Sequence, residues 1–274
     1  MLTNINRRTF IAGFAALAGL GLTACGSDAA SGSGEAVGDL LAQIRDRGEM
    51  IFATEGTWSP WTFHNEAGEL TGFDIEVARA IASELGVEAS FAEGEWDGLL
   101  AGVDSGRYDT MANGVSVTDE REEKYDFTEP YAFNNIVVIV RGDNDEIASL
   151  EDLEGKTTAN TLASSYAALA ESYGATCTGV DDFNATIELL DAGRIDATLN
   201  DEVVFNDYMA QHPDANLKVA AMAPEPTHIA YPLRREEATE SLREAMNEAI
   251  DALRADGTLA QISNTYFGMD ITAA

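Results

Sequence analysis

The segment NGVSVTDER, residues 113–121, sets one arginine behind small and hydroxyl residues in a very acidic chain. The guanidinium of Arg121 can offer two parallel donors in one plane, which suits a carboxylate. Ser116 alternates with Thr118 on one face of an extended stretch, so its hydroxyl can reach the same bound group. Gly114 offers a carbonyl and, without a side chain, permits close approach. The alternative is a surface arginine that pairs with neighbouring acids after a helix cap at Thr118.

Asp201 is the candidate partner of opposite charge. It ends a predicted strand in the segment TLNDEVVF, where its carboxylate can hold an ammonium group. A ligand such as a free amino acid carries both charges, and burying either one unpaired costs several kcal/mol. A site for it needs one bidentate cation, one carboxylate and neutral hydrogen-bonding groups between them. The alternative role of Asp201 is to cap the following helix, and the two roles are compatible.

Two serines begin another predicted helix, in the segment TLASSYAALA. The free amides of Ser164 and Ser165 would face an incoming carboxylate, helped by the helix dipole. Plain capping by serine is the alternative, and this stretch alone favours it.

Aromatic and acidic residues follow the first predicted strand and begin a later helix. Glu55 and Trp58 lie in the segment EGTWSPW, and Trp96 lies in EWDGLL. Aromatic rings can sandwich an aliphatic side chain and stack on charged groups. Glu55 would favour a ligand with a second, distal positive group.

Motifs for other chemistry are missing from the sequence. The three histidines, His64, His212 and His228, lie far apart and give no metal-ligand spacing. There is no glycine-rich nucleotide motif and no nucleophile elbow. These residues therefore predict binding without catalysis, with no metal and no cofactor.

Helical and strand patterns alternate from about residue 39 onward, which predicts parallel sheets with ligands at the carboxyl ends of strands. One example is residues 73–85, whose apolar residues have helical spacing, with Asp74 expected to cap the start. A sequence echo joins residues 106–109 and 193–196, each a helix ending on Gly followed by Arg-x-Asp and a short strand. The echo predicts two α/β lobes of similar build.

Two extended segments are expected to join these lobes. The first is rich in Ile and Val and follows residue 127, and the second is THIAYP, residues 227–232. Two crossings make a hinge, with a cleft between the lobes. Residues 236–255 are predicted to form an amphipathic helix, followed by a shorter helix, and both would pack on the first lobe.

Composition excludes some partners. The chain has 274 residues, 45% of them hydrophobic, which allows a sizeable core. The net charge is −32, so phosphate backbones would be repelled and nucleic acid is not an expected partner. One domain or two small ones fit this length.

The N-terminus has the layout of a secretory signal, with Arg7 and Arg8, an apolar run of residues 10–22 and small residues before Cys25. This predicts a signal peptide over 1–24. Leu-Thr-Ala-Cys resembles a bacterial lipoprotein box, which implies a lipid on Cys25. The arginine pair also resembles a twin-arginine export signal.

The stretch that follows Cys25 is rich in Gly, Ser and Ala, so residues 25–37 are predicted to be a lipidated cysteine and a flexible tether. The other cysteine, Cys177, is expected to be a buried, unreactive thiol in a strand.

Six segments together carry a resemblance to a known family: EGTWSPWTFHNEAGELTGFDIEVARAIASELGV, EWDGLLAGVDSGRYD, NGVSVTDEREEKYDFTEPY, SLEDLEGK, GRIDATLND and DGTLAQISNTYFG. The chain resembles the extracellular solute-binding proteins, family 3, of polar amino acid ABC importers. The match runs in order along nearly all of residues 38–270. It implies an α/β, periplasmic-binding-protein-like type II fold, the two-lobed Venus flytrap with two crossover hinge strands.

The implied domains are lobe 1 at 38–131 plus 229–274, lobe 2 at 136–225, and hinges at 131–135 and 225–229. The resemblance implies that Arg121 holds the α-carboxylate, that Asp201 holds the α-ammonium, and that the other residues complete the site. The complete predicted binding set is Glu55, Trp58, Trp96, Asn113, Gly114, Ser116, Arg121, Thr161, Ser164, Ser165 and Asp201.

A finer resemblance, in EGTWSPWTFH, TDEREEKYDFTEPY and TLASSYAALAESYGA, is to the cystine-binding members. The chain departs from them at Gly114, where they carry a larger polar residue. Cystine carries a distal ammonium group, which agrees with a role for Glu55, and cationic amino acids also carry a distal positive group.

The implied partners are an ABC permease and its ATPase, and the protein is expected to be a monomer anchored outside the cytoplasm by its lipid. The same fold hosts a few small-carboxylic-acid lyases, in which a carboxylate such as Glu55 would act as general acid or base.

Overall fold

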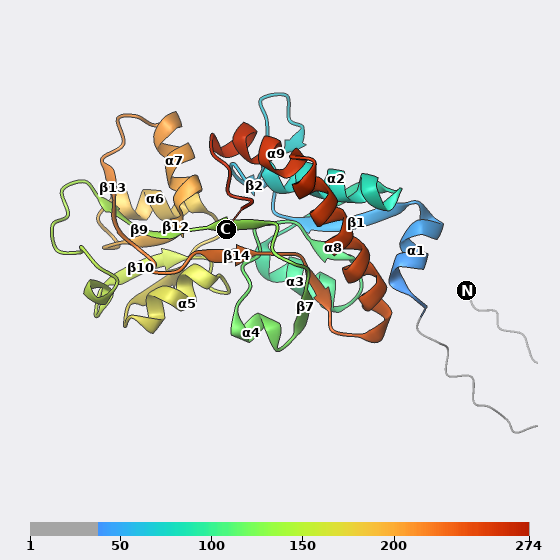
Figure 1. The fold of residues 1–274 in the computed structure, drawn as a ribbon. Helices are drawn as coiled ribbons and strands as arrows, with labels where there is room; N and C mark the ends of the chain where they lie inside the picture. Colours follow the sequence, from blue (N-terminus) through green and yellow to red (C-terminus); the bar gives the residue numbers. More distant parts are fainter. Residues whose placement is uncertain (1–37, 274) are drawn as a thin grey trace, which may run out of the picture. The chain divides into compact units, whose positions relative to one another are not determined.

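The computed structural model describes residues 38–273, and Figure 1 shows their arrangement. The predicted signal peptide, Cys25 and the tether lie outside the described residues. The helices are α1 (Leu40–Arg47), α2 (Phe73–Leu85), α3 (Trp96–Asp104), α4 (Asp119–Glu122), α5 (Ser165–Ser172), α6 (Phe183–Asp191), α7 (Glu202–Gln211), α8 (Glu240–Ala255) and α9 (Thr258–Phe267), with short 3-10 turns η1 (Glu151–Leu153) and η2 (Glu237–Thr239). The strands are β1 (Glu49–Thr54), β2 (Thr57–Trp58), β3 (Thr62–His64), β4 (Leu70–Thr71), β5 (Glu88–Glu93), β6 (Thr110–Met111), β7 (Tyr125–Phe127), β8 (Ala132–Asn134), β9 (Ile136–Arg141), β10 (Thr157–Asn160), β11 (Thr176–Gly179), β12 (Thr198–Asp201), β13 (Leu217–Met222), β14 (Thr227–Ile229) and β15 (Pro232–Arg234).

The first group of elements is built on the parallel sheet β5-β1-β6. Helix α2 follows a small antiparallel sheet, β2-β3-β4, and ends at Gly86 in the left-handed conformation that glycine tolerates. Because successive strands are parallel, their carboxyl ends meet at one edge of the sheet. The loops after β1 and β6 therefore emerge side by side.

Asp74 does not cap α2, which corrects the sequence expectation. Gly72 occupies the N-cap position, and Asp74 lies inside the first turn with a fully buried carboxyl group. That carboxyl accepts hydrogen bonds from the Tyr131 hydroxyl, at 2.7 Å, and from the Gly114 amide. Tertiary contacts have taken the place of local capping.

The second group contains the parallel pair β10-β11 and the sheet β12-β9-β13. In the latter sheet β9 runs antiparallel to both neighbours, so the prediction of parallel sheets holds for only part of the fold. The reason is that β9 continues from β8 instead of following a crossover helix. Its residues 136–140 are all buried, as expected for a central strand with helices packed around it.

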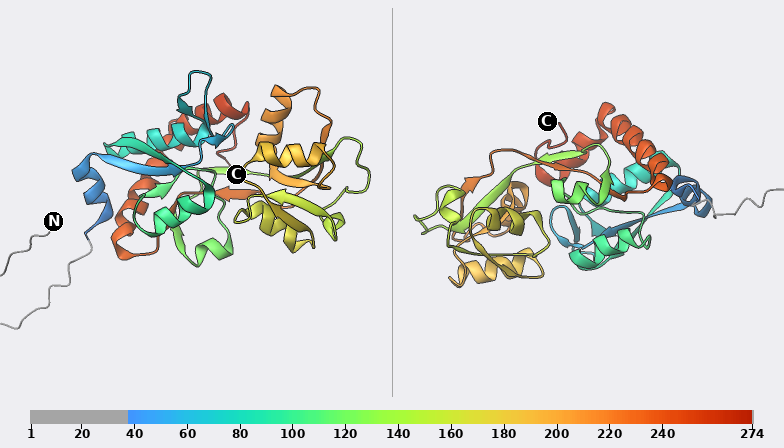
Figure 2. Two further views of the ribbon diagram at one scale, coloured as in Figure 1. Left: turned by 180° about the vertical axis from the view of Figure 1, so that it is seen from behind. Right: turned by 90° about the horizontal axis from the view of Figure 1, so that it is seen from below.

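Two antiparallel strands, β8 and β14, run together between these two groups. Thr227 pairs with Asn134 and Ile229 pairs with Ala132. Figures 1 and 2 both show the two strands side by side between the β9–β13 elements and the remainder of the described chain. Each strand leads directly from one group of elements into the other.

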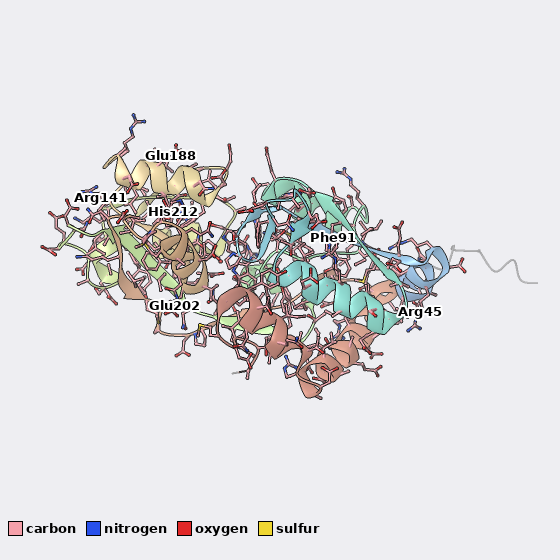
Figure 3. All side chains as sticks on the ribbon, turned by 90° about the horizontal axis from the view of Figure 1, so that it is seen from above. Arg45, Phe91, Arg141, Glu188, Glu202 and His212 are labelled. Atoms are coloured by element: carbon pink, nitrogen blue, oxygen red, sulfur yellow. The ribbon has the colours of Figure 1, made fainter. Side chains whose placement is uncertain are left out.

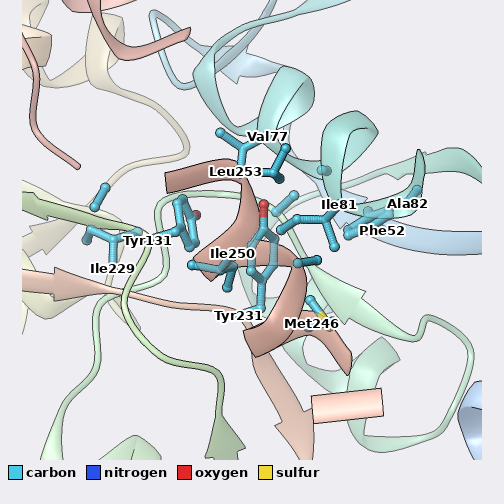
Figure 4. Packing of buried hydrophobic residues seen from close by; sticks show 14 of the residues in the cluster. Phe52, Val77, Ile81, Ala82, Tyr131, Ile229, Tyr231, Met246, Ile250 and Leu253 are labelled. Carbon is cyan, nitrogen blue, oxygen red and sulfur yellow. The ribbon is translucent and has the colours of Figure 1, made fainter. Parts of the chain in front are cut away.

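The largest core cluster consists mainly of residues of the first group, joined by Val203 and Val204 of α7, and Figure 4 shows part of it. Helix α8 contributes Leu242, Met246, Ile250 and Leu253, all buried, as its helical spacing predicts. The helix begins at Glu240, later than predicted, because η2 forms the preceding turn. The helix therefore anchors the C-terminal segment to the first group.

The surface of the molecule is strongly charged, and Figure 3 shows side chains such as Arg45 and Glu188 projecting from the ribbon.

Cys177 lies in β11, as predicted, but it is only partly buried. Burial raises the pKa of its thiol, which keeps it in the less reactive protonated form. Within residues 38–273 no helix has the length and apolar character needed to cross a membrane.

Candidate functional site

A cavity of about 610 Å³, counting the part open to solvent, lies where the two groups of elements face each other. It brings together nine of the predicted binding residues, from four separate stretches of the chain. They are Glu55, Trp58, Trp96, Asn113, Gly114, Ser116, Thr161, Ser164 and Ser165.

Glu55 and Asn113 form one unit at the carboxyl ends of β1 and β6. The Asn113 amide nitrogen donates to the Glu55 carboxylate at 2.6 Å, and the Asn113 carbonyl accepts from the Glu55 backbone amide at 2.7 Å. Burial raises the pKa of Glu55 to about 7, and the nearby Asp182 carboxylate adds to this shift. Asn113 opposes it. Asn113 is thus a positioning residue that fixes the direction of Glu55.

Gly114 has a backbone φ of +55°, and a Cβ there would lie 2.7 Å from the Trp58 ring. Glycine is needed because any side chain would collide with that indole. The Asp74 carboxyl accepts from the Gly114 amide, which fixes the backbone next to the cavity. Sequence reasoning had assigned this space to the ligand, whereas in the structure Trp58 occupies it.

Arg121 lies directly behind the cavity wall and is 9% exposed. Its guanidinium donates to the carbonyl of Ser116 at 2.9 Å and to that of Ala163 at 3.3 Å. The guanidinium carbon also lies 5.1 Å from the centre of the Trp96 ring. The alternative of a surface arginine paired with local acids is wrong, although Thr118 does cap α4 as that alternative assumed.

Asp201 also lies behind the wall and is 1% exposed. Burial raises the pKa of its carboxyl to about 7, and the facing polar groups of Tyr166, Asn134 and Trp61 partly oppose the rise. One carboxyl oxygen has no hydrogen-bond partner among the described residues. Asp201 occupies the N-cap position of α7, but its side chain does not cap the helix. The carboxyl group is therefore directed toward the side chains of Tyr166, Asn134 and Trp61 and away from the helix amides.

Serines from the two groups meet at the cavity. The hydroxyl of Ser116 lies 3.2 Å from that of Ser165, the first residue of α5. Ser164 caps this helix by accepting from the Ala167 amide at 3.2 Å. The capping alternative is therefore confirmed for Ser164, while Ser165 extends toward the residues that follow β6.

Aromatic rings surround the cavity. Trp58 stacks on the core residue Trp61, with 5.6 Å between ring centres, and meets Tyr166 edge to face at 6.4 Å. Phe183 and Trp96 complete the set. Such rings can hold an aliphatic chain and stabilise a nearby cation.

Sequence reasoning missed eight lining residues and included two, Arg121 and Asp201, that do not line the cavity. Four of the missed residues lie at or just after the carboxyl ends of strands in the second group, where the sequence predicted ligands without naming residues. Others lie in the first turns of α5 and α6. The missed residues are Thr57, Asn160, Tyr166, Asp181, Asp182, Phe183, Thr186 and Asn200.

Comparison with known families gives one match that covers most of the chain. Residues 50–269 match the model of the bacterial extracellular solute-binding proteins, family 3. The L-cystine-binding protein TcyA of Bacillus subtilis is 35% identical over 269 residues, covering 97% of this chain and 99% of that protein.

Two of the similar solved structures illustrate the likeness over most of the chain. An ancestral arginine-binding protein bound to arginine superposes with a TM-score of 0.74 at 33% identity, covering 81% of this chain and 99% of the other. The L-cystine solute receptor of Neisseria gonorrhoeae, in its unliganded open conformation, gives a TM-score of 0.58 at 36% identity, covering 86% of this chain and 100% of the other. Both likenesses establish the type II periplasmic-binding-protein fold.

Proposed function

The chain belongs to the bacterial extracellular solute-binding proteins, family 3, and on that premise we propose that it captures a free polar amino acid, L-cystine in the first instance, for an ABC importer. One observation carries this proposal. Nine binding residues predicted from separate segments line a single cavity, with Arg121 and Asp201 directly behind its wall.

The α-carboxylate of the ligand would bind near Arg121, Ser116 and the first turn of α5. A carboxylate is a stronger partner for a guanidinium than the two backbone carbonyls that Arg121 contacts without ligand. The α-ammonium would bind the free carboxyl oxygen of Asp201. Both charges of the zwitterion are then paired, and neither is buried alone.

Closure of two lobes would couple these contacts to delivery. The lobes would be residues 38–131 with 229–274, and residues 136–225, moving about β8 and β14. Arg121 belongs to the first and Asp201 to the second, so only a closed arrangement pairs both ends of one ligand. The higher TM-score to an arginine-bound structure than to an open, unliganded one supports a closed arrangement here.

The identity of the side chain rests on the relatives and on the cavity. TcyA of Bacillus subtilis is named for cystine, which favours that ligand. A cationic amino acid is the second candidate, favoured because Glu55, Asp181 and Asp182 line the cavity and no lysine, arginine or histidine does. A lyase activity is disfavoured because the relatives described above are named as binding proteins or as a solute receptor.

Partners and location follow from the family. Its members are extracellular, so the chain acts outside the cytoplasm. We propose that the protein is a monomer whose closed form docks on a membrane permease driven by an ATPase. We further propose that the protein is exported by the twin-arginine route and that a lipid on Cys25 then holds it at the membrane.

A thermal-shift panel with the common amino acids and L-cystine, each at saturating concentration, tests the function. A ligand that binds only the folded state raises the melting temperature by mass action. A large shift with cystine alone supports cystine, and shifts with arginine and lysine instead support the second candidate. No shift with any amino acid overturns the proposal and directs attention to product formation from small carboxylic acids.

A further inference from the structure

Asp182 is an acidic residue of the cavity that the predicted binding set did not contain. It lies at the N-cap of α6, where one carboxylate oxygen accepts from the Ala185 amide at 2.8 Å. No donor within residues 38–273 reaches its other oxygen. The residue lines the same cavity as Glu55, which comes from the first group of elements.

Asn160, at the end of β10, adds an uncommitted acceptor to the same wall. Its amide nitrogen donates to the Leu199 carbonyl at 2.8 Å, which fixes the orientation of the side chain. Its side-chain oxygen is buried and has no partner in the described part of the chain, and the residue is 4% exposed. Its backbone carbonyl accepts from Val180 at 3.2 Å, so it adjoins the turn that carries Asp182. A buried acceptor without a donor is costly, and a ligand N–H group would relieve that cost.

The carboxylate of Glu55 interacts with this wall through the charge of Asp182. One of its carboxylate oxygens accepts from Asn113, and the Asp182 charge contributes to the raised pKa of Glu55. Two carboxylates that share a closed cavity repel each other unless a cation lies between them. None of the residues that line the cavity is a lysine, arginine or histidine, so the protein itself supplies no such cation there.

We propose that Asp182, with the side-chain oxygen of Asn160 and with Glu55, forms a subsite for the distal ammonium or guanidinium group of the ligand. Asp182 is its specificity-determining residue. The inference rests on the proposed function and extends it, because it states why the cavity closes on some amino acids and not on others. A distal cation screens Asp182 from Glu55 and satisfies Asn160, whereas a neutral side chain leaves the carboxylates opposed.

Calorimetric titration of the purified protein with L-cystine, L-arginine and L-glutamine tests this subsite. Asp182→Asn keeps an oxygen that can cap α6 and removes the charge. We expect the affinity for whichever ligand carries the distal cation to fall at least about tenfold, while glutamine binding is unchanged or tighter. The matched control is Asp191→Asn, the same charge change at the other end of α6, which should leave the ratio of affinities unaltered.

Three other outcomes overturn the inference. An unaltered affinity ratio in Asp182→Asn removes Asp182 as a determinant, and if all three affinities fall equally the residue has a structural role. This result leaves the proposed function standing, as does a wild-type protein that binds only amino acids without a distal cation. A wild-type protein that binds no amino acid overturns the proposed function, and this inference with it.

Discussion

Arg121 and Asp201 are positioned by different contacts in the ligand-free protein. The guanidinium is fixed by two carbonyls and the Trp96 ring, and burial lowers its pKa. Asp201 keeps one carboxyl oxygen unpaired, at a position where burial raises its pKa. Each group is therefore poorly compensated without ligand, and a zwitterion would improve both environments at once.

Arg121→Ala is expected to weaken amino acid binding by about 2–5 kcal/mol, because it leaves the ligand carboxylate buried without its cation. Isothermal titration with the ligand found in the thermal-shift panel measures this loss. Arg45→Ala on the exposed face of α1 serves as the control and should bind like the parent. Parental affinity in Arg121→Ala would place the carboxylate clamp elsewhere.

Glu55 predicts a pH dependence of stability in the ligand-free protein. Its pKa is raised from 4.5 to about 7, so the folded state holds the proton more tightly than the unfolded state. Protonation of Glu55 therefore stabilises the folded state. This contribution is complete below the unfolded-state pKa of 4.5 and is lost as the pH rises through about 7. We therefore expect a higher melting temperature at pH 5.5 than at pH 8, by about 2–4 °C for each kcal/mol.

In Glu55→Gln the melting temperature should depend less on pH, because the amide resembles the protonated carboxyl at every pH. Asp74 and Asp201, whose pKa values burial also raises to about 7, contribute to the slope that remains. Glu84→Gln on the exposed face of α2 is the matched control. A Glu55→Gln profile as steep as the parent profile would show that this carboxyl does not contribute.

At the scale of elements, the cavity depends on where helices and strands begin and end. Strands β10 and β12 end at Asn160 and Asp201, and helix α3 begins at Trp96. Each end is supported by packing within its own group: α5 contacts β10 and β12 in the second group, and α3 contacts β1 and β6, α2 contacts β1 and α8 contacts α2 in the first. Stability of the site therefore rests on residues that never meet the ligand.

Met246→Ala in the buried face of α8 is expected to lower the free energy of unfolding by about 2–5 kcal/mol, through lost burial and the cavity it leaves. Chemical denaturation of the ligand-free protein measures it. Glu248→Ala, on the exposed face of the same helix, should change stability by less than about 0.5 kcal/mol. Similar losses in the two variants would contradict the packing described for α8.

At the scale of the whole described body, direct contacts join the two groups of elements without a ligand. Ser59 donates to the Asp207 carboxylate at 2.9 Å, and Gln211 holds the same oxygen at 2.8 Å. The Ser116–Ser165 contact and the Arg121 bond to Ala163 are further links. These bonds hold the two groups of elements together in this structure, so they would add to whatever a ligand contributes to the proposed closure.

Ser59→Ala is expected to speed ligand release several-fold while leaving the association rate nearly unchanged. The lost hydrogen bond contributes about 1 kcal/mol and exists only when the two groups are in contact. Stopped-flow fluorescence of the cavity tryptophans measures both rates. Ser172→Ala removes a serine hydrogen bond internal to α5 and is the control. An unchanged release rate in Ser59→Ala would mean that this bond does not limit opening.

The sequence by itself determined the helices, the main strands and most of the residue types in the cavity. Helical spacing located α2 and α8, glycines marked helix ends, and the segment containing Gly114 and Ser116 was recognisable from its composition. These features are local, because periodicity and capping depend on residues within a few positions of each other. The family resemblance supplied the long-range order in which the segments occur.

Only the tertiary structure decided which of these residues share a cavity and what each side chain contacts. Asp74 has the sequence position of a helix cap, yet long-range bonds to Tyr131 and Gly114 make it a support of the site. Asp182 and Asn160 carry no motif, and they reach the cavity because β10 and β11 end beside each other. The antiparallel direction of β9 and the burial of Arg121 depend likewise on partners far away in the chain. Local pattern cannot encode such pairings, since they arise from the packing of whole elements.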